Sequence, residues 1–308
     1  MRELIAVGQP IGVKLFSDGV LVIGFSDGDT AAKACGLKEG DIITALGGES
    51  LDTIEELRAC LNANGGSGAE LTVKRGSRTL TLEASPRQDE SGEYRLGAWV
   101  RDSMAGIGTM TFYDPQSGTF GALGHGVTDV DTGKLLPLDH GSIMNASVKA
   151  VKKGEHGAPG ELKGDFDFAR DSGTLYANTE SGIFGKLSAQ DAETIGGKTY
   201  PIAKKEEVRP GQATILATVS GKETKEYAIE IEKVYPAPDT ARNLLLRVTD
   251  EELLAQTGGV VQGMSGSVIV QNDRIVGAVT HVLLDDPSRG YGIFIGNMLD
   301  AAGLSYEA

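Results

Sequence analysis

A serine between two glycines is the residue of this chain best suited to nucleophilic chemistry. Ser265 lies in the segment Gly263-Met264-Ser265-Gly266-Ser267, just before the apolar run at residues 268–270. Because glycine has no Cβ, the chain can turn sharply at this segment and expose the serine hydroxyl. The same turn can point backbone N–H groups at an oxygen that gains negative charge. The segment therefore predicts an acyl-transfer nucleophile, although Gly-x-Ser-Gly also occurs in ordinary turns.

A serine nucleophile needs a base, and the chain has only four histidines. His125 lies between two glycines that leave its ring reachable, and a neutral imidazole with a pKa of about 6.5 can accept the hydroxyl proton. His140 is the closest rival. His156 lies among lysines and glycines typical of a solvated loop, and His281 ends the apolar run after the serine, where it would pack or line the substrate cleft. A base that precedes the serine in the chain favours the chymotrypsin-like order.

The composition favours a β-rich globular protein with two domains. The chain has 308 residues, of which 43 are glycine, 40% are hydrophobic and only 6% are aromatic, a balance that favours short strands and tight turns. The net charge of -14 repels phosphate groups, so neither nucleic acid nor an anionic lipid surface is an expected partner. The sequence contains neither an HExxH metal motif nor a phosphate-binding glycine loop, so no cofactor is expected.

Two further features concern the compartment and the thiols. No stretch approaches the roughly 18 apolar residues that span a bilayer, and no basic segment followed by an apolar one marks an export signal in this sequence. Cys35 and Cys60 have neither metal-ligand spacing nor a CxxC partner. This favours two small buried thiols, although the sequence leaves a disulfide open.

Residues 1–86 are predicted to form one α+β unit. Alternating or fully apolar runs predict its strands, at residues 11–15, 19–25, 42–46, 70–75 and 78–82. The last two runs flank Gly76-Ser77, which is the pattern of a β-hairpin. Asp52 or Thr53 can cap a helix that ends near Leu61.

The run from Gly19 to Asp41, followed by Ile42-Ile43, resembles a PDZ domain of the bacterial, protease-associated type. Such domains bind extended peptides by adding a strand to a sheet edge, and backbone N–H groups of one loop capture the terminal carboxylate. By position, the resemblance implies that this loop is Gln9-Pro10-Ile11-Gly12 and that Val13 begins the receiving strand. The alternative is an ordinary edge strand whose groove is filled within the protein.

The sequence changes character after residues 87–97, which are polar and are interpreted as a linker. From residue 98 to residue 308, short apolar segments alternate with glycine turns, which predicts a β-barrel or sandwich of about 200 residues. A last helix is expected around Asn297 to Ala302, stopped by Gly303.

The combined pattern resembles the SpoIVB (stage IV sporulation protein B) peptidase family, whose members are PDZ-bearing serine peptidases. The resemblance runs almost from end to end, through segments at residues 8–15, 122–126, 178–185, 257–267 and 277–282. It implies a mostly β fold in which the PDZ domain precedes a trypsin-like peptidase domain, residues 98–308, built as a chymotrypsin-like double β-barrel. One departure is Val268, which stands where these peptidases commonly have proline.

By this resemblance His125 is the general base, Ser265 is the nucleophile and Asp250 is the third member of the triad. A carboxylate in that position would fix the tautomer of the imidazole and stabilise the imidazolium. The N–H groups of Gly263 and Ser265 are the expected oxyanion donors.

The residues themselves leave the third member open. Asp165 and Asp167 follow His125 at a separation found in chymotrypsin-like enzymes. Asp250 would also serve as the N-cap of a helix that begins at Glu251, and the two roles compete for one carboxylate.

The resemblance also implies a function, a sporulation signalling serine endopeptidase. Such an enzyme would be exported or anchored and would work between the forespore and mother-cell membranes. Its expected target is a membrane-anchored regulatory protein, whose cleavage releases an intramembrane protease that processes a sigma-factor precursor. The PDZ domain would govern self-association, substrate docking or autocleavage. The alternative, from a different class, is a PDZ peptide-binding scaffold with an inactive protease-like barrel.

Overall fold

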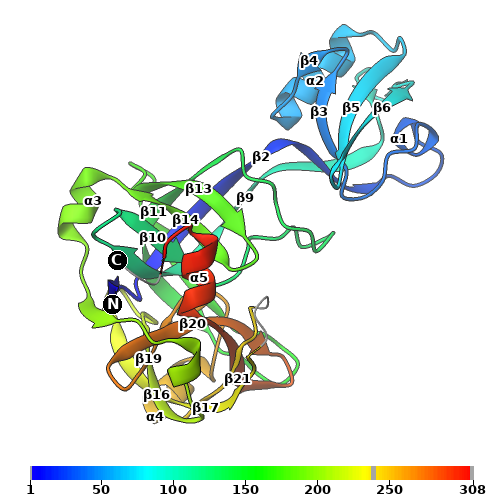
Figure 1. Cartoon of the computed structure of the whole chain (residues 1–308). Helices are drawn as coiled ribbons and strands as arrows, with labels where there is room; N and C mark the ends of the chain where they lie inside the picture. Colours follow the sequence, from blue (N-terminus) through cyan, green and yellow to red (C-terminus); the bar gives the residue numbers. More distant parts are fainter. Residues whose placement is uncertain (1, 237–240, 306–308) are drawn as a thin grey trace. The chain divides into compact units, whose positions relative to one another are not determined.

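The described part of the chain, residues 2–236 and 241–305 of a computed structural model, divides into two compact units (Figure 1). The barrel unit comprises Met1–Lys14, Ala105–Val127 and Gly141–Ala308. The PDZ unit comprises Leu15–Met104 and Thr128–His140. Among the described residues, no helix is both long enough and apolar enough to cross a bilayer.

The PDZ unit is built from short elements whose ends follow local sequence signals. They are α1 (Ala31–Ala34), β3 (Ile42–Leu46), β4 (Glu49–Ser50), α2 (Ile54–Ala63), β5 (Ala69–Arg75), β6 (Arg78–Ala84), β7 (Arg87–Gln88) and β8 (Tyr94–Arg95). Thr53 and Glu56 form a capping box, in which each side chain accepts a hydrogen bond from the other residue's N–H, and this starts α2. β5 and β6 form the expected hairpin and pair along their whole length.

Two long strands give the units boundaries that differ from the expected ones. β2 (Pro10–Phe25) is one continuous strand of 16 residues, and its first residues, to Lys14, belong to the barrel unit. β9 (Ala98–Asp114) returns from the PDZ unit to the barrel unit at residue 105. The expected linker at residues 87–97 holds β7 and β8, which pair with each other inside the PDZ unit.

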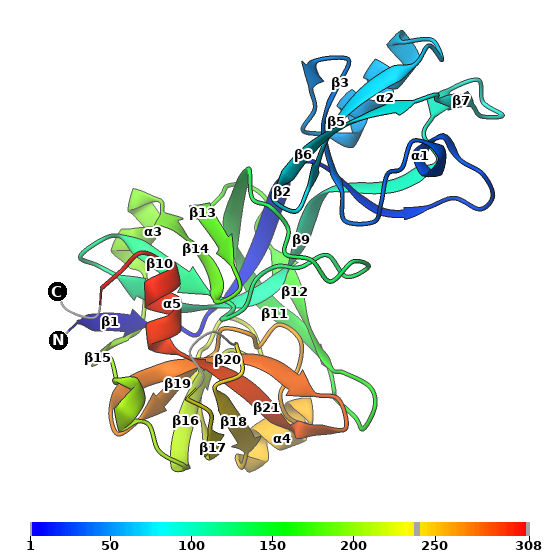
Figure 2. The same cartoon turned by 45° about the vertical axis from the view of Figure 1, so that its right-hand side comes forward.

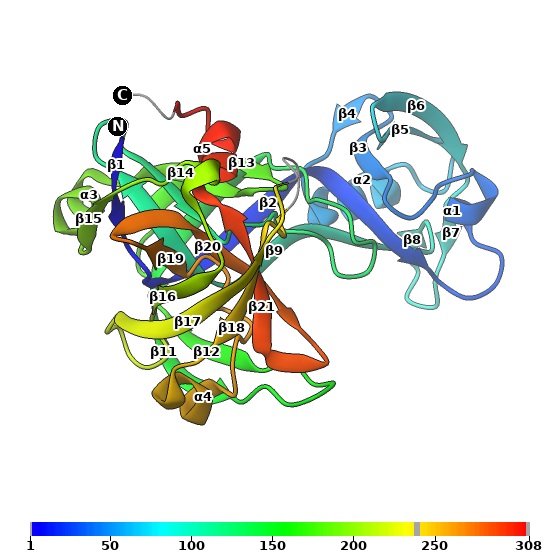
Figure 3. The ribbon, with the colours of Figure 1, turned by 60° about the horizontal axis from the view of Figure 1, so that its bottom comes forward.

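Six strands of the barrel unit close into a barrel in the order β16-β17-β18-β21-β20-β19 (Figures 2 and 3). Their bounds are β16 (Gly211–Ala217), β17 (Lys225–Val234), β18 (Leu244–Val248), β19 (Val268–Gln271), β20 (Arg274–Leu283) and β21 (Asp286–Phe294). Buried side chains such as Ile215, Ile229, Leu246 and Val279 fill this barrel. Apolar residues that alternate along each strand therefore form its core.

The other half of the barrel unit contains a second set of antiparallel strands, in the order β15-β1-β9-β10-β14-β13-β11, with β12 on β11. Its further elements are β1 (Glu3–Ala6), β10 (Thr119–Ala122), β11 (His140–Lys152), β12 (Glu161–Phe166), β13 (Gly173–Thr179), β14 (Gly182–Leu187), α3 (Ala189–Thr194), β15 (Lys198–Pro201) and the 3₁₀ helix η1 (Lys205–Glu207). Helices α4 (Glu251–Thr257) and α5 (Ile295–Ala301) complete the unit, and α5 matches the expected last helix to within two residues.

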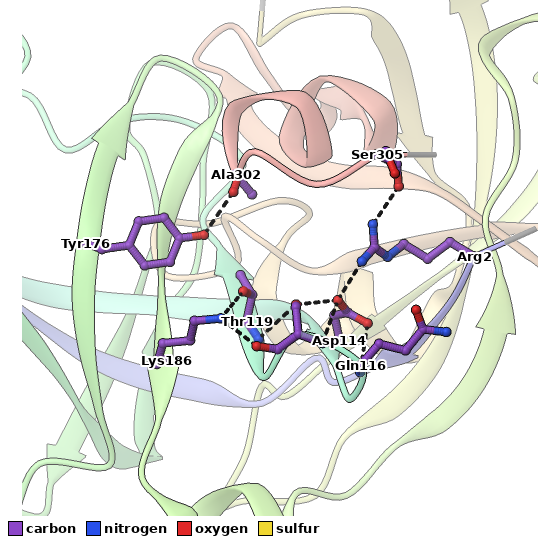
Figure 4. A network of polar contacts seen from close by, with 9 residues as sticks. Arg2, Asp114, Gln116, Thr119, Tyr176, Lys186, Ala302 and Ser305 are labelled. Atoms are coloured by element: carbon purple, nitrogen blue, oxygen red, sulfur yellow. Dashed lines mark hydrogen bonds and ion pairs between the residues drawn. The ribbon is translucent and has the colours of Figure 1, made fainter. Parts of the chain in front are cut away.

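A buried ion pair ties the ends of the described chain to the turn between β9 and β10 (Figure 4). Arg2 donates to a carboxylate oxygen of Asp114 over 3.0 Å, and the Asp114 side chain is fully buried. Arg2 also donates to the carbonyl oxygen of Ser305 over 2.6 Å. The Asp114 carboxylate accepts further hydrogen bonds from the N–H groups of Gln116 and Ser117, so its buried charge is well compensated.

Candidate active site

The loop that carries Ser265 lies between α4 and β19 and depends on its glycines. Gly263 and Gly266 have φ angles of +96° and +99°, a region that other residues rarely adopt. A Cβ on Gly266 would lie 2.0 Å from the carbonyl oxygen of Thr109 and 2.7 Å from the backbone nitrogen of Leu123. The sharp turn and the close approach of β9 therefore both require glycine at this position, as the sequence suggested.

Replacing Gly266 with alanine is therefore expected to damage both stability and activity. The added Cβ meets backbone that cannot move freely, so we expect a loss of more than about 2 kcal/mol in the free energy of unfolding and at least about a hundredfold lower kcat/KM. Chemical denaturation and peptidase assays measure the two effects. The control is Gly303→Ala, which has a φ of +71° but nothing within 4 Å of the new Cβ. Equal effects of the two substitutions would show that the contact with Thr109 is unimportant.

Strand β9 holds the nucleophile loop through three hydrogen bonds. The N–H of Thr109 donates to the carbonyl oxygen of Ser265 over 2.9 Å, and the Thr109 hydroxyl donates to that of Gly263 over 2.8 Å. The Thr111 hydroxyl donates to the carbonyl oxygen of Gly266 over 2.8 Å. With these carbonyls directed toward β9, the loop has a fixed backbone orientation. Threonines in an alternating strand carry no sequence signal for this role, so sequence reasoning missed both.

The same backbone orientation leaves two N–H groups without a partner. The N–H groups of Met264 and Gly266 donate to the carbonyls of Val261 and Val279. By contrast, the N–H groups of Gly263 and Ser265 donate to no group in the described part of the chain. Two unpaired amide donors beside a serine hydroxyl form the arrangement needed to bind an oxyanion.

The Ser265 hydroxyl is held by strand β20 in this structure. It donates to the carbonyl oxygen of Thr280 over 2.8 Å. The Thr280 hydroxyl in turn donates to the carbonyl oxygen of Ala241 over 2.6 Å. Attack on a substrate requires the Ser265 hydroxyl to leave the Thr280 carbonyl and donate its proton to a base.

His125 is anchored to the same residue of β9 that holds Ser265. The carbonyl oxygen of Thr109 accepts a hydrogen bond from the N–H of Leu123, two residues before His125. Leu123 has a φ of +69°, unusual for a residue with a side chain and a sign of local strain. Thr109 thus contacts both the loop of Ser265 and the segment that leads to His125, although the two are far apart in the sequence.

The environment of His125 favours a neutral ring with its free lone pair on Nε2. Nδ1 lies 2.8 Å from the carbonyl oxygen of Gly126, and since a carbonyl only accepts, Nδ1 carries the hydrogen. Burial lowers the pKa of His125 below its usual value, while the Gly126 carbonyl acts in the opposite direction. The ring can therefore accept a proton at Nε2 at neutral pH.

Asn178 clamps the peptide unit that follows this histidine. Its side chain accepts a hydrogen bond from the N–H of Val127 over 2.8 Å and donates to the Val127 carbonyl over 2.9 Å. The contact fixes the chain two residues after His125. Asn178 opens one of the segments that carry the family resemblance, which was the available signal, but its role could not be read from the sequence.

His281 is the second imidazole of the site. Its ring centroid lies 5.0 Å from that of His125, and the two ring planes are inclined by 37°. Burial, followed by the charges of His125 and Arg242, lowers the pKa of His281 to about 4. His281 is therefore uncharged at neutral pH.

The structure does not bring Asp250 to His125. The Asp250 carboxylate caps α4, accepting a hydrogen bond from the N–H of Leu253 over 2.9 Å, and it accepts another from the N–H of Ala228 over 3.3 Å. Asp250 is therefore the N-cap of α4, which was the alternative role that the sequence left open for it. Asp165 and Asp167 are exposed on and after β12. Among the described residues, no carboxylate forms a hydrogen bond with His125.

This geometry makes Asp250 a determinant of stability. Asp250→Ala is expected to lower the free energy of unfolding by about 1 kcal/mol through loss of the cap. Asp250→Ser keeps a capping oxygen and removes the carboxylate, so it should preserve both stability and kcat. Thermal denaturation and peptidase kinetics on the two variants separate the roles, because a loss of kcat in the serine variant would restore Asp250 to the triad.

The expectation that Gln9-Pro10-Ile11-Gly12 and Val13 form the peptide-binding loop of the PDZ domain is wrong, because these residues lie in the barrel unit. The carbonyl oxygen of Gln9 accepts a hydrogen bond from the N–H of Met110 on β9, and residues 10–13 are buried. A Cβ on Gly12 would lie 2.6 Å from side-chain atoms of Met144 and Phe166. The segment is part of a packed sheet and offers no open edge to a peptide.

Within the PDZ unit, the chain's own segment around β9 lies beside the second half of β2. The carbonyl of Gly97 accepts a hydrogen bond from the N–H of Ser26 over 3.0 Å, and β9 pairs with β2. The Asp102 carboxylate accepts a hydrogen bond from the N–H of Ile54 at the start of α2 over 2.9 Å. In the PDZ unit the chain's own segment therefore lies along this part of β2, whereas the alternative expectation concerned residues 9–13.

The remaining candidate residues lie outside this site. His140 stacks on Phe16 in the PDZ unit, with ring centroids 4.5 Å apart, and His156 contacts the carbonyl of Asp285. Cys35 and Cys60 are free thiols, and both are half-buried, so the expected full burial is not found. Within residues 2–236 and 241–305, no group of three or more His, Cys, Asp or Glu side chains could hold a metal ion.

Two protein-family models match this chain. The family model described as SpoIVB peptidase S55 matches residues 92–299, and a PDZ domain model matches residues 27–75. Together with the PDZ unit and the closed six-stranded barrel, these matches define the class as a PDZ-containing serine peptidase, and the expected mostly β fold class is confirmed. More particularly, the match over residues 92–299 shows that the chain belongs to the SpoIVB peptidase S55 family, as its motifs suggested.

Individual proteins show more distant similarity. The PDZ domain of an SdrC-like protein from Listeria monocytogenes is 22% identical, with a TM-score of 0.25 over 27% of this chain and 87% of that one. The Rv3671c protease from M. tuberculosis, in its active form, is 14% identical, with a TM-score of 0.36 over 66% of this chain and 76% of that one. A Clostridium perfringens (strain 13 / Type A) protein named as a zinc metalloprotease is 32% identical over 69 residues, 22% of this chain. The chain spans only 21% of that protein's length.

Proposed function

We propose that this chain is a serine endopeptidase in which Ser265 is the nucleophile and His125 the general base. The observation that carries the proposal is the arrangement around Thr109, which holds the serine loop and the histidine segment on one strand. The two unpaired N–H groups of Gly263 and Ser265 complete the site.

The reaction follows from these positions. Nε2 of His125 accepts the Ser265 hydroxyl proton as Oγ attacks the carbonyl carbon of the scissile peptide bond. The carbonyl oxygen becomes negatively charged, and the N–H groups of Gly263 and Ser265 stabilise it. The imidazolium then gives its proton to the departing amine. Water next attacks the acyl group while Nε2 accepts its proton, and the imidazolium returns that proton to Ser265 Oγ as the acid product leaves.

A fluorophosphonate probe tests the proposal directly. The probe phosphonylates a serine only when the serine is activated, so we expect one label per chain, located on Ser265 by peptide mass spectrometry. Ser265→Ala should remove the label. Absence of label on the wild-type chain, under conditions in which a control serine protease reacts fully, would reject the peptidase.

The scaffold function is the second candidate, and one observation favours it. The Ser265 hydroxyl donates to Thr280 in this structure, and its hydrogen-bond partner is not His125. A site fixed in that state would leave an inactive barrel that serves a peptide-binding PDZ domain. The probe distinguishes the two, because only the peptidase reacts with it.

For the finer role, we propose a sporulation signalling endopeptidase that acts between the forespore and mother-cell membranes. The support for this role is that the chain belongs to a peptidase family named after the sporulation protein SpoIVB. Its substrate would be a membrane-anchored regulatory protein that restrains an intramembrane protease for a sigma-factor precursor, and the PDZ unit would govern self-association, substrate docking or autocleavage. Incubating the chain with such a regulator in vesicles should yield a defined fragment with the wild type and none with Ser265→Ala. An intact regulator, at concentrations that label Ser265 fully, would exclude this substrate.

A further inference from the structure

Among the described residues, no carboxylate forms a hydrogen bond with the proposed general base. The only hydrogen bond that His125 forms through Nδ1 in the described part of the chain is to the carbonyl of the next residue, Gly126. That carbonyl fixes the tautomer, but it carries no charge to stabilise an imidazolium. Some other group near the ring must therefore supply an acceptor when His125 becomes protonated, or the base remains a simple dyad.

His281 is the side chain that packs against His125, with ring centroids 5.0 Å apart. Its Nδ1 is buried and has no hydrogen-bond partner among the described residues. Buried polar atoms are nearly always paired, and exceptions call for an explanation, of which a catalytic role is one. The ring that carries this unpaired nitrogen packs against the proposed general base, and the nitrogen is such an exception.

The backbone of β20 is adapted to place this ring. Val279 pairs with Gly292 and Val282 pairs with Gly290 on β21, so the register shifts between them and Thr280 and His281 lie in a bulge. Bulges near active sites redirect side chains. The two bulge residues serve the same site, because the Thr280 carbonyl holds the Ser265 hydroxyl while the His281 ring meets His125.

The charge state of His281 suits an acceptor. Burial first, then the charges of His125 and Arg242, hold the pKa of His281 at about 4. At neutral pH the ring is uncharged, and one of its nitrogens carries a lone pair. The buried Nδ1 is the nitrogen suited to that lone pair, because a buried N–H without a partner would cost more.

We propose that His281 is a positioning residue that acts through His125, with its Nδ1 lone pair serving as the acceptor for the imidazolium in place of a triad carboxylate. The inference rests on the proposed peptidase function. His125 gains the Ser265 proton on Nε2 and keeps its original hydrogen on Nδ1. That Nδ1–H is shared between the Gly126 carbonyl and His281 as the transition state forms. No proton passes to His281, and the proton on Nε2 leaves with the amine product.

Two substitutions separate the acceptor from the ring. His281→Asn places an amide oxygen close to the position of Nδ1 and removes the ring, whereas His281→Phe keeps an aromatic ring and removes the acceptor. We expect about a ten- to hundredfold lower kcat in the phenylalanine variant with KM changed less than about twofold, and nearly wild-type kcat in the asparagine variant. His140→Asn, an exposed histidine of the PDZ unit, is the control and should change nothing.

The pH profile gives a readout that a packing role would not move. An acceptor for the imidazolium raises the pKa of His125, so His281→Phe should shift the acid limb of kcat/KM to lower pH, while His281→Asn should leave it in place. The proposal would be overturned if the His281→Phe variant kept full activity with an unshifted acid limb. It would also be overturned if His281→Asn lost as much activity as His281→Phe.

An NMR titration keeps the inference independent of turnover. In the Ser265→Ala background, the ring signals of His125 should titrate at lower pH when His281→Phe is added, and the shift should be absent with His281→Asn. If the wild-type chain proved inactive, the peptidase function would fail while this titration still decided the role of His281. Identical titration of His125 in all three proteins would reject that role.

Discussion

Replacing Ser265 with alanine is expected to lower kcat/KM about 10⁵- to 10⁶-fold, the size of effect seen when a serine peptidase loses its nucleophile. The other serine of this turn is not available to take its place. The neighbouring Ser267 is fully buried and its N–H bonds to the carbonyl of Met264 within the same turn. Cleavage of an unfolded protein substrate, and of the chain itself, followed by mass spectrometry measures the loss. Equal turnover in the two proteins would exclude the mechanism.

The same substitution should leave the fold almost unchanged, which makes its effect on activity interpretable. Ser265 contributes one side-chain hydrogen bond, to Thr280, worth about 1 kcal/mol. The melting temperature should therefore fall only slightly. Ser267→Ala is the matched control, because it removes a hydroxyl two residues away and that hydroxyl has no hydrogen-bond partner among the described residues. It should keep full activity, so a large loss there would point to damage of the loop itself.

Glycine signals in the sequence led to the two residues that this mechanism needs. Around Ser265 they predicted a sharp turn, and the positive φ angles of Gly263 and Gly266 show why no other residue fits. Around His125 they predicted a reachable ring. The third member could not be settled in this way, since an aspartate before Glu251 satisfies a helix cap as well as a triad, and only the contacts of Asp250 distinguish the two.

The fold was predictable wherever the signal was local. The hairpin of β5 and β6 and the capped helix α2 depend on residues close in sequence, and both are present as expected. The prediction of a PDZ loop at residues 9–13 was wrong because the structure of this segment depends on a strand that is distant in the sequence. Gln9 pairs with Met110 across about a hundred residues of sequence, and a strand pattern does not say which strand it will meet.

The residues missed by sequence reasoning share the same cause. Thr109 and Thr111 look like ordinary members of an alternating strand, and Asn178 like part of a turn motif. Their roles arise only when β9 lies against the serine loop and when the chain after His125 meets β13. Supporting contacts of an active site are long-range by nature, so the chemical residues were easier to find than the residues that position them.

The acidity of His125 should set the lower pH limit of the peptidase. Burial lowers its folded pKa below the unfolded value of about 6.5, so the ring stays neutral and basic to lower pH than a free imidazole. The acid limb of kcat/KM should therefore lie below pH 6.5. The lowered pKa also makes the free energy of unfolding depend on pH. The contribution of His125 is fully present above its unfolded pKa and is lost as the pH falls through its lowered folded pKa. A limb above pH 6.5 would contradict the buried, neutral state.

Replacing His125 with alanine is expected to reduce kcat/KM about 10⁴-fold or more, because the Ser265 hydroxyl then has no base. The Thr280 carbonyl accepts a hydrogen bond from this hydroxyl but is too weak a base to remove its proton. Binding should be affected far less than turnover. The small activity that remains should lose the acid limb, since the group that titrates is gone. His156→Ala is the control, because that exposed ring contacts only the Asp285 carbonyl among the described residues. Steady-state kinetics across pH on both variants measure the difference. If His125→Ala stayed active with an unchanged limb, another group would have to be the base, and the arrangement around Thr109 would then serve only the fold.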